Sequence, residues 1–225
     1  WETRVVSLPT SAGAREQVLL VASDVTEQRA EAQAGFEAAI AQREMLVKEV
    51  HHRIKNNLQG VAGLLQQIGQ RKPEVAGPIS EVVSQVQAIA QVYGLQVGES
   101  GPLQLVSVVE AITGSVQRTF GRTIRFSVSG PSAGQWMLPE AEAIPIALTL
   151  NELLTNAVKH SAAAPEAEVV CTLSCADAEV QVSIANEAAL PAGFNLARIP
   201  GGVSGLGLVR ALLPRRSASL AIEQR

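Results

Sequence analysis

The chain has 225 residues, of which 47% are apolar and only 3% are aromatic. That apolar fraction excludes a wholly disordered chain, and the length is enough for one large or two small domains. A net charge of −3 argues against nucleic acid as a partner, because such binding needs a basic surface. No apolar run is long enough to span a bilayer and no signal peptide opens the chain, so we expect a cytoplasmic protein without a membrane partner. Cys171 and Cys175 are expected to be free thiols.

Two apolar segments open the chain. Residues 1–8 and 16–22 predict β-strands joined by a turn at residues 9–13. Two strands cannot hold a core alone, so residues 1–26 are expected to be the end of a larger sheet domain. Asp24 or Thr26 is placed to cap the helix that follows.

A long helix is predicted from about residue 27 to residue 71, because the apolar positions follow a heptad repeat. β-branched residues occupy the same heptad position at Ile40, Val47, Ile54, Val61 and Ile68. A turn at residues 72–78 leads to a second helix with an apolar stripe over residues 79–93. Two antiparallel helices cannot bury these stripes alone. The hairpin of residues 27–98 is therefore expected to form a homodimer, which makes a four-helix bundle.

After a break in the pattern near residues 98–102, residues 99–225 predict a separate domain. Helices are expected over residues 106–120 and 139–161 and from residue 205, with strands over 123–129, 169–175 and 180–185. Helices alternating with an antiparallel strand pair indicate a two-layer α/β sandwich. The predicted fold class is thus α+β, with a helical hairpin followed by this sandwich.

The first polar cluster covers residues 49–59. With Val47 and Ile54 facing the helical seam, His52 takes the most exposed heptad position and His51 flanks the seam. Asn56 lies one turn beyond His52 on the same side. An exposed neutral imidazole is a competent nucleophile towards a phosphoryl group. Taken alone, the cluster also fits an ordinary solvated helix face.

The second polar cluster covers residues 151–160. Glu152, Asn156 and His160 follow one another at four-residue spacing, so they share a helix face, with Lys159 beside them. An amide oxygen is a suitable ligand for Mg²⁺ that also holds substrate phosphates. Lys159 and His160 are placed to contact the phosphates, and Glu152 to polarise a water or a nucleophile. The alternative is a polar face joined by pairs along the helix.

The third cluster is the glycine-rich segment of residues 201–208, directly before the last predicted helix. Glycines at a helix start let a phosphate approach free backbone N–H groups and the positive end of the helix dipole. The segment is not a P-loop, because no Gly-Lys-Ser/Thr follows. A glycine turn before a helix is common, so it is informative only together with the other clusters.

In order and composition, the three clusters resemble those of the sensor histidine kinases. Residues 49–59 are similar to the phosphoacceptor box of the subfamily with a His-Arg-x-Lys-Asn signature, related to the HWE kinases. Residues 151–160 resemble the N box of the Bergerat-type (GHKL) ATP-binding fold, and residues 205–208 its second glycine box. Asp-Val-Thr-Glu at residues 24–27 resembles the exit motif of a PAS sensor domain.

The resemblance implies that His52 is the phosphoacceptor, that Asn56 supports phosphatase activity and that Asn156 holds Mg²⁺. Glu49 and Glu152 are both candidates for the carboxylate that acts as base or orients the imidazole. ATP is the implied cofactor, and its implied contacts are Asn151, Asn156, Lys159, His160, Asn186, Gly205, Leu206 and Gly207. The implied partner is the receiver domain of a response regulator, whose aspartate takes the phosphoryl group.

The sequence departs from the family pattern at three positions. Arg53 follows the phosphoacceptor, where many kinases have an acid. Asn186 stands where an aspartate usually binds the adenine amine, and an amide oxygen accepts that hydrogen bond without a charge. Val203 replaces the opening glycine of the second box. A phosphatase-biased pseudokinase scaffold with a degenerate ATP site is therefore the alternative function. An ATPase of the same fold, related to chaperones or topoisomerases, is disfavoured by the hairpin with its exposed histidine.

Overall fold

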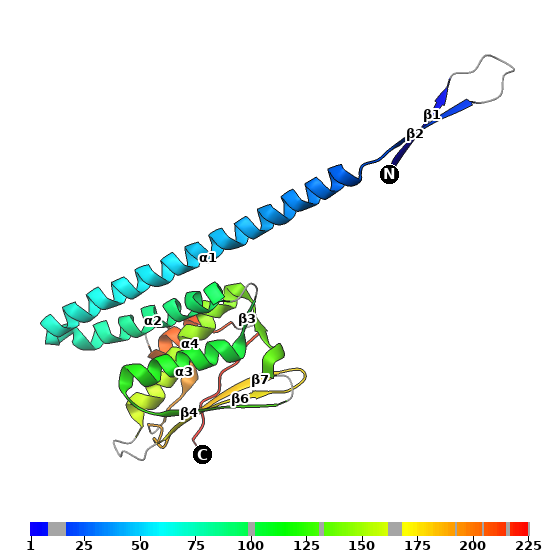
Figure 1. The fold of residues 1–225 in the computed structure, drawn as a ribbon. Helices are drawn as coiled ribbons and strands as arrows, with labels where there is room; N and C mark the ends of the chain where they lie inside the picture. The colour runs from blue at the N-terminus through cyan, green and yellow to red at the C-terminus, as the bar shows by residue number, and fades with distance from the viewer. Residues whose placement is uncertain are drawn as a thin grey trace. The chain divides into compact units, whose positions relative to one another are not determined.

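The computed structural model describes residues 1–8, 17–98, 102–130, 133–161, 168–191, 193–203, 205–214 and 217–224 (Figure 1). The chain divides into two compact units, residues 1–47 and residues 48–225. Helix α1 (Thr26–Arg71) begins in the first unit and ends in the second. The finer division into residues 1–26, 27–98 and 99–225 stays a prediction.

In the first unit, two strands form an antiparallel ribbon. Strand β1 (Glu2–Leu8) pairs with β2 (Gln17–Ser23), with Glu2 opposite Ser23. The two predicted strands are confirmed to within one residue, whereas the turn predicted at residues 9–13 lies outside the described residues. Asp24 Oδ1 accepts hydrogen bonds from the Thr26 backbone N–H (3.0 Å) and hydroxyl (2.6 Å). These hydrogen bonds lower the pKa of Asp24, and they identify Asp24 as the capping side chain of α1.

The helical hairpin is present as predicted. A short 3₁₀ turn, η1 (Pro73–Val75), joins α1 to α2 (Ala76–Gly98). The second helix begins earlier than expected. Pro78 is accommodated because the N–H groups of the first helical turn have no partner within the helix. The heptad residues Ile40, Val47, Val61 and Ile68 are exposed in the single chain.

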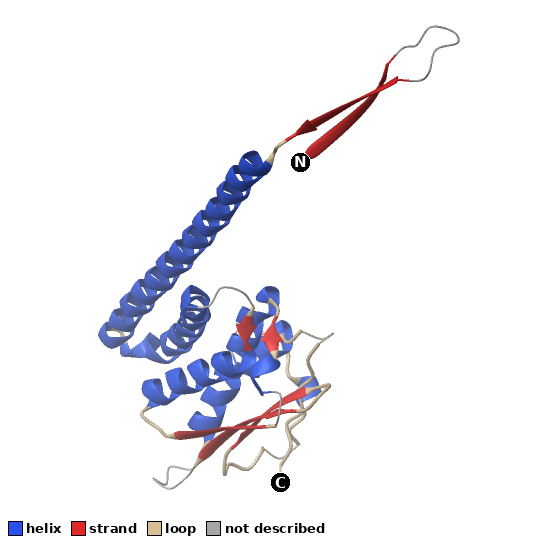
Figure 2. Cartoon of the chain, turned by 45° about the vertical axis from the view of Figure 1, so that its right-hand side comes forward, coloured by secondary structure: helices blue, strands red, loops and turns tan. Residues whose placement is uncertain are grey.

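The C-terminal sheet has three strands in the order β4–β6–β7, which are labelled in Figure 1 and drawn in red in Figure 2. Strand β4 (Ile124–Ser129) runs parallel to β6 (Val169–Cys175), with Ile124 opposite Val169. Strand β7 (Val180–Ala185) is antiparallel to β6. Alternate residues of β6 are buried under helices α3 (Leu105–Phe120) and α4 (Glu140–His160). This arrangement confirms the predicted mixed class, a helical region followed by a domain that contains a sheet.

One hydrophobic core joins the hairpin to the sheet domain. Ala88 and Val92 of α2 belong to the same buried cluster as Ile112 of α3, Leu154 of α4 and Leu173 of β6. The packing is therefore continuous across the predicted break at residues 98–102. As a result, α2 lies against α4, which carries the second polar cluster (Figure 1).

Several short elements complete the second unit. Strand β3 (Leu103–Gln104) pairs with β5 (Met137–Leu138), and 3₁₀ turns occur at η2 (Ala133–Gln135) and η3 (Leu196–Arg198). Helix α5 (Gly205–Leu212) begins at the predicted residue. Across the described ranges, none of the helices combines the length and apolarity that crossing a membrane requires.

Candidate active site

The two adjacent histidines of α1 have different environments, as the heptad pattern predicted. His52 is exposed and His51 is half-buried. The Asn56 amide nitrogen lies 3.5 Å from both ring nitrogens of His52. Because these distances are at the limit of hydrogen bonding and equal, the contact does not select one tautomer of the ring. His52 therefore keeps a solvent-facing imidazole with Asn56 beside it.

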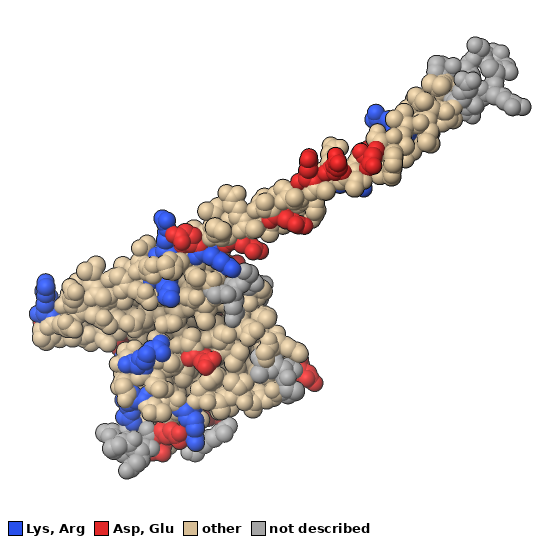
Figure 3. Space-filling model, viewed as in Figure 1, with Lys and Arg blue, Asp and Glu red and all other residues tan. Residues whose placement is uncertain are grey.

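Glu49 forms an ion pair with the residue that follows His52. Its Oε1 accepts from Arg53 Nε at 2.6 Å, and both side chains are exposed. The hydrogen bond and the charge of Arg53 lower the pKa of Glu49, so this carboxylate is ionised at neutral pH. Acidic side chains, with fewer basic ones, are visible along α1 on the face seen in Figure 3. Glu49 thus lies near His52 but is bound to Arg53.

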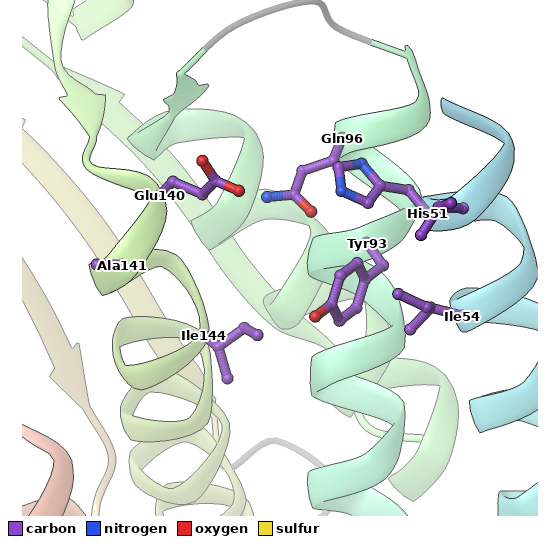
Figure 4. Close-up of a pocket in the computed structure, with 8 residues that line it drawn as sticks. His51, Ile54, Tyr93, Gln96, Glu140, Ala141 and Ile144 are labelled. Carbon is purple, nitrogen blue, oxygen red and sulfur yellow. The ribbon is translucent and has the colours of Figure 1, made fainter. Parts of the chain in front are cut away.

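His51 points into a cavity between α1, α2 and α4 (Figure 4). The cavity has a volume of about 570 Å³, and its lining includes Gln96, Glu140 and Ile144. The His51 ring lies 5.5 Å from the Tyr93 ring, centroid to centroid, at an angle of 57°. Because Tyr93 belongs to α2, this contact holds the two helices of the hairpin together. His51 is therefore a packing residue and less available to a phosphate donor than His52.

The second polar cluster lies on α4, where its members differ in burial. Asn151 is 3% exposed and Glu152 is 6% exposed, whereas Asn156 is half-buried and Lys159 and His160 are exposed. Asn151 and Ser84 of α2 form a reciprocal pair. The Asn151 amide donates to the Ser84 hydroxyl at 2.9 Å, and that hydroxyl donates to Asn151 Oδ1 at 3.1 Å. Asn151 is thus occupied by α2.

Glu152 joins three elements through its two carboxylate oxygens. Oε2 accepts from the backbone N–H of Gly205 at 2.8 Å, and Oε1 accepts from Gln85 Nε2 of α2 at 3.0 Å. Gly205 is the first residue of α5, so the carboxylate lies at the positive end of that helix. The same Gln85 amide also donates to the Val203 carbonyl at 3.2 Å.

The glycines of the third cluster are required by the backbone. Gly205 has a φ of +60°, a conformation that favours glycine. A Cβ on Gly207 would lie 2.8 Å from the Gly202 nitrogen and 2.9 Å from the Pro200 oxygen, so the preceding loop packs directly on the helix start. Leu206, between them, is half-buried. Ser204 of this cluster lies outside the described residues.

Asn186 follows β7 and contacts the same helix. Its Nδ2 donates to the Ala157 carbonyl of α4 at 2.9 Å, which directs Oδ1 away from that carbonyl. Arg210 of α5 donates to the carbonyls of Ala197 (3.1 Å) and Ile199, which fixes the segment before the glycine-rich loop. Asn186 is thus joined to α4, and α5 is joined to the segment that precedes the glycine-rich loop.

The predicted site residues fall into two groups. Glu49, His52 and Asn56 lie together on α1, whereas the α4 residues meet Asn186 and the start of α5. No hydrogen bond between described residues joins His52 to Glu152. Three residues of α2 that contact the α4 cluster were not predicted as site residues: Glu81, Ser84 and Gln85. Their signal is a polar stripe at three- and four-residue spacing on a largely apolar helix.

The donor set suits a metal that arrives with a nucleotide. Among the described residues, no group of three or more His, Cys, Asp or Glu side chains could hold a metal ion. Mg²⁺ bound with phosphates needs only one or two protein oxygens, since phosphates and water supply the others. The half-buried Asn156 amide therefore fits Mg²⁺ in a complex with a nucleoside triphosphate.

Comparison with known proteins finds a family that matches part of the chain. Residues 49–120 match the histidine kinase family HisKA_2. The chain is 28% identical over 210 residues to the sensor histidine kinase PdtaS of Mycobacterium tuberculosis, which covers 90% of this chain and 40% of that protein. It is 27% identical over 168 residues to a blue-light-activated histidine kinase of Brucella anthropi, which covers 73% of this chain and 30% of that protein.

A solved structure is similar in fold. The histidine kinase domain of a blue-light activated histidine kinase from Erythrobacter litoralis aligns with a TM-score of 0.50 at 17% identity, over 76% of this chain and 83% of that one. The chain is therefore similar to sensor histidine kinases, and residues 49–120 match the histidine kinase family HisKA_2. It spans about two fifths of the length of the PdtaS relative.

Proposed function

We propose that this chain is the kinase module of a sensor histidine kinase that transfers the γ-phosphoryl group of Mg²⁺-ATP to His52. The observation that carries the proposal is the presence of two features in one chain. One is an exposed histidine on a helical hairpin, and the other is the polar cluster of α4 next to the start of α5. The first supplies a nucleophile. The second gathers an amide, a lysine and a helix N-terminus, which together suit a triphosphate.

In this proposal the nucleotide contacts come from α4, α5 and the segment after β7. Asn156 holds Mg²⁺, which neutralises phosphate charge. Lys159 and His160 contact phosphate oxygens, and the backbone of Gly205, Leu206 and Gly207 receives the phosphates at the helix start. The Asn186 Oδ1 accepts a hydrogen bond from the adenine amine, and Asn151 supports the α4 face.

The neutral His52 attacks the γ-phosphorus through a ring nitrogen lone pair. The bond between the γ-phosphorus and the bridging oxygen breaks, ADP leaves, and the phosphorylated ring releases its remaining acidic proton. Glu49 and Glu152 are the candidate carboxylates for orienting the ring or receiving that proton. Asn56 is the residue proposed to support phosphatase activity. Catalysis then depends mostly on positioning and charge neutralisation.

The proposed assembly is a homodimer through the hairpin. The exposed apolar residues of the α1 seam, such as Val61 and Leu64, need a partner surface. A response-regulator receiver domain is the proposed acceptor of the phosphoryl group from His52. Residues 1–26 are proposed as the end of a PAS sensor domain, whose signal reaches the kinase through α1.

Incubation with γ-labelled ATP and Mg²⁺ tests the proposal, with His52→Gln and the neighbouring His51→Gln compared with wild type. We expect acid-labile, alkali-stable label that is lost only in His52→Gln. A folded wild-type dimer that takes no label would favour the pseudokinase scaffold. ATP hydrolysis without label on the protein would favour an ATPase of the same fold.

A further inference from the structure

Three polar residues of α2 bond to the α4 cluster, one to each of three proposed site residues. Lys159 Nζ lies 3.3 Å from Glu81 Oε1, and Ser84 is paired with Asn151. Gln85 donates to Glu152, and also to the Val203 carbonyl before the α5 start. We call Glu81, Ser84 and Gln85 the α2 clamp.

The α2 clamp occupies groups that a triphosphate would use. The ammonium of Lys159 is neutralised by Glu81, and both side chains are 40% or more exposed. The Glu152 carboxylate, oriented by Gln85, accepts the N–H of Gly205, so an internal anion already lies where the helix start would bind phosphate. Glu81 also adds negative charge beside the expected phosphate position.

We propose that the α2 clamp competes with Mg²⁺-ATP, so that the contact of α2 with α4 is a closed state of the nucleotide site that nucleotide must displace. The inference rests on the proposed function, because it assumes that α4 and α5 bind ATP. It adds a specific means of control: movement of α2 in the hairpin changes nucleotide affinity through three named side chains.

The size of the effect follows from the contacts. The observed dissociation constant of a ligand that binds only the open state is the intrinsic constant divided by the open fraction. The Glu81 ion pair is half-exposed, so its loss should tighten ATP binding about twofold to fivefold. Gln85 donates to a buried carboxylate, and its loss should tighten binding about tenfold.

The test is titration of the chain of residues 1–225 with Mg²⁺-ATP by calorimetry. Glu81→Gln and Gln85→Ala are compared with two controls, Glu74→Gln in the exposed η1 turn and Gln87→Ala on α2. Both control side chains lack a hydrogen bond to another described residue. We expect tighter binding in the first pair and wild-type affinity in the second. Equal affinity in all five proteins would overturn the α2 clamp and leave the proposed function standing.

A second measurement needs no substitution. Hydrogen exchange of the peptide covering residues 76–98 in the wild-type chain should become faster when Mg²⁺-ATP is added, because coupling between two sites is reciprocal. Unchanged or slower exchange with bound ATP contradicts the α2 clamp. If no protein binds ATP, including the Glu81→Gln and Gln85→Ala variants that each lack a clamp contact, both the α2 clamp and the kinase proposal are contradicted.

Discussion

Glu152 Oε2 accepts a hydrogen bond from the backbone nitrogen of Gly205 at 2.8 Å, which places a buried carboxylate at the first residue of α5. Helix N-termini favour anions, and here the anion comes from the protein itself. Glu152 is therefore both a structural cap for α5 and a candidate catalytic carboxylate. The two roles predict opposite effects on binding and on chemistry.

Glu152→Gln is expected to tighten ATP binding and slow phosphorylation. The neutral amide removes a charge that repels phosphate, whereas loss of a positioned base costs on the order of 100-fold in rate. Calorimetry measures the first effect, and single-turnover labelling of His52 measures the second. If the labelling rate is unchanged, Glu152 is not the base, and Glu49→Gln becomes the variant expected to be slow.

Gly207→Ala is expected to destabilise the loop before α5 and weaken ATP binding. The added Cβ would lie 2.8 Å from the Gly202 nitrogen, closer than packing allows, and overpacking of this kind costs about 1–3 kcal/mol. Gly201→Ala is the matched control, because a Cβ there meets nothing within 4 Å. Urea unfolding and ATP titration of both variants provide the comparison. Equal urea midpoints and equal ATP affinities in the two variants would mean that the loop moves aside freely.

Leu64→Glu is expected to convert the proposed dimer to a monomer. Leu64 is exposed in the single chain and lies on the predicted seam, where a charge in each partner would be buried. Gln66→Glu carries the same charge on the outward helical position and should leave the dimer intact. Light scattering at micromolar concentration distinguishes the two. A wild-type monomer under those conditions would contradict the homodimer.

Leu154→Ala is expected to lower the free energy of unfolding by about 2–5 kcal/mol. Leu154 is fully buried on the core side of α4, whereas the adjacent Leu153 is only partly buried. Leu153→Ala should therefore cost less. Denaturant midpoints and slopes measured for both variants test this difference, and a larger loss in Leu153→Ala would place the core on the other side of α4.

The buried Cys171 predicts a loss of stability at alkaline pH. Burial raises the pKa of this thiol, opposed by a hydrogen bond from Thr113. The unfolded chain therefore releases the thiol proton first as pH rises above the ordinary thiol pKa of about 8.5, which favours unfolding. Cys171→Ala removes this contribution, so its urea midpoint should fall less between pH 8 and pH 10 than that of wild type. An equal fall in both proteins would show that Cys171 does not contribute.

Local patterns in the sequence predicted much of the fold. The bounds of β6 and β7 agree with the predicted strands, because alternation of apolar residues marks a half-buried strand directly. The heptad pattern distinguished exposed His52 from half-buried His51. Strands β3 and β5 were missed because two residues are too few to show a period. The sequence alone also did not predict that α2 packs into the core of the sheet domain.

The sequence identified candidate site residues but not the contacts that they make in the structure. The α4 cluster and the glycines were identified because helical spacing and glycine requirements are local properties. The partners of Asn151 and Glu152 on α2 are 67 positions away in the chain, and no local pattern specifies such a pairing. Glu152 was expected to face a substrate, yet both of its oxygens are occupied by protein donors in this structure.

The reciprocal pair of Ser84 and Asn151 has a mechanical consequence. Each side chain serves the other as both donor and acceptor in a buried setting, so a slide of α2 along α4 by a fraction of a turn would leave two polar groups unsatisfied. Gradual shear between the two helices is thereby penalised at every intermediate position. Separation of the hairpin from α4 is consequently a two-state transition. A graded stimulus would change the fraction of molecules in which the helices are separated, and not the distance between the helices.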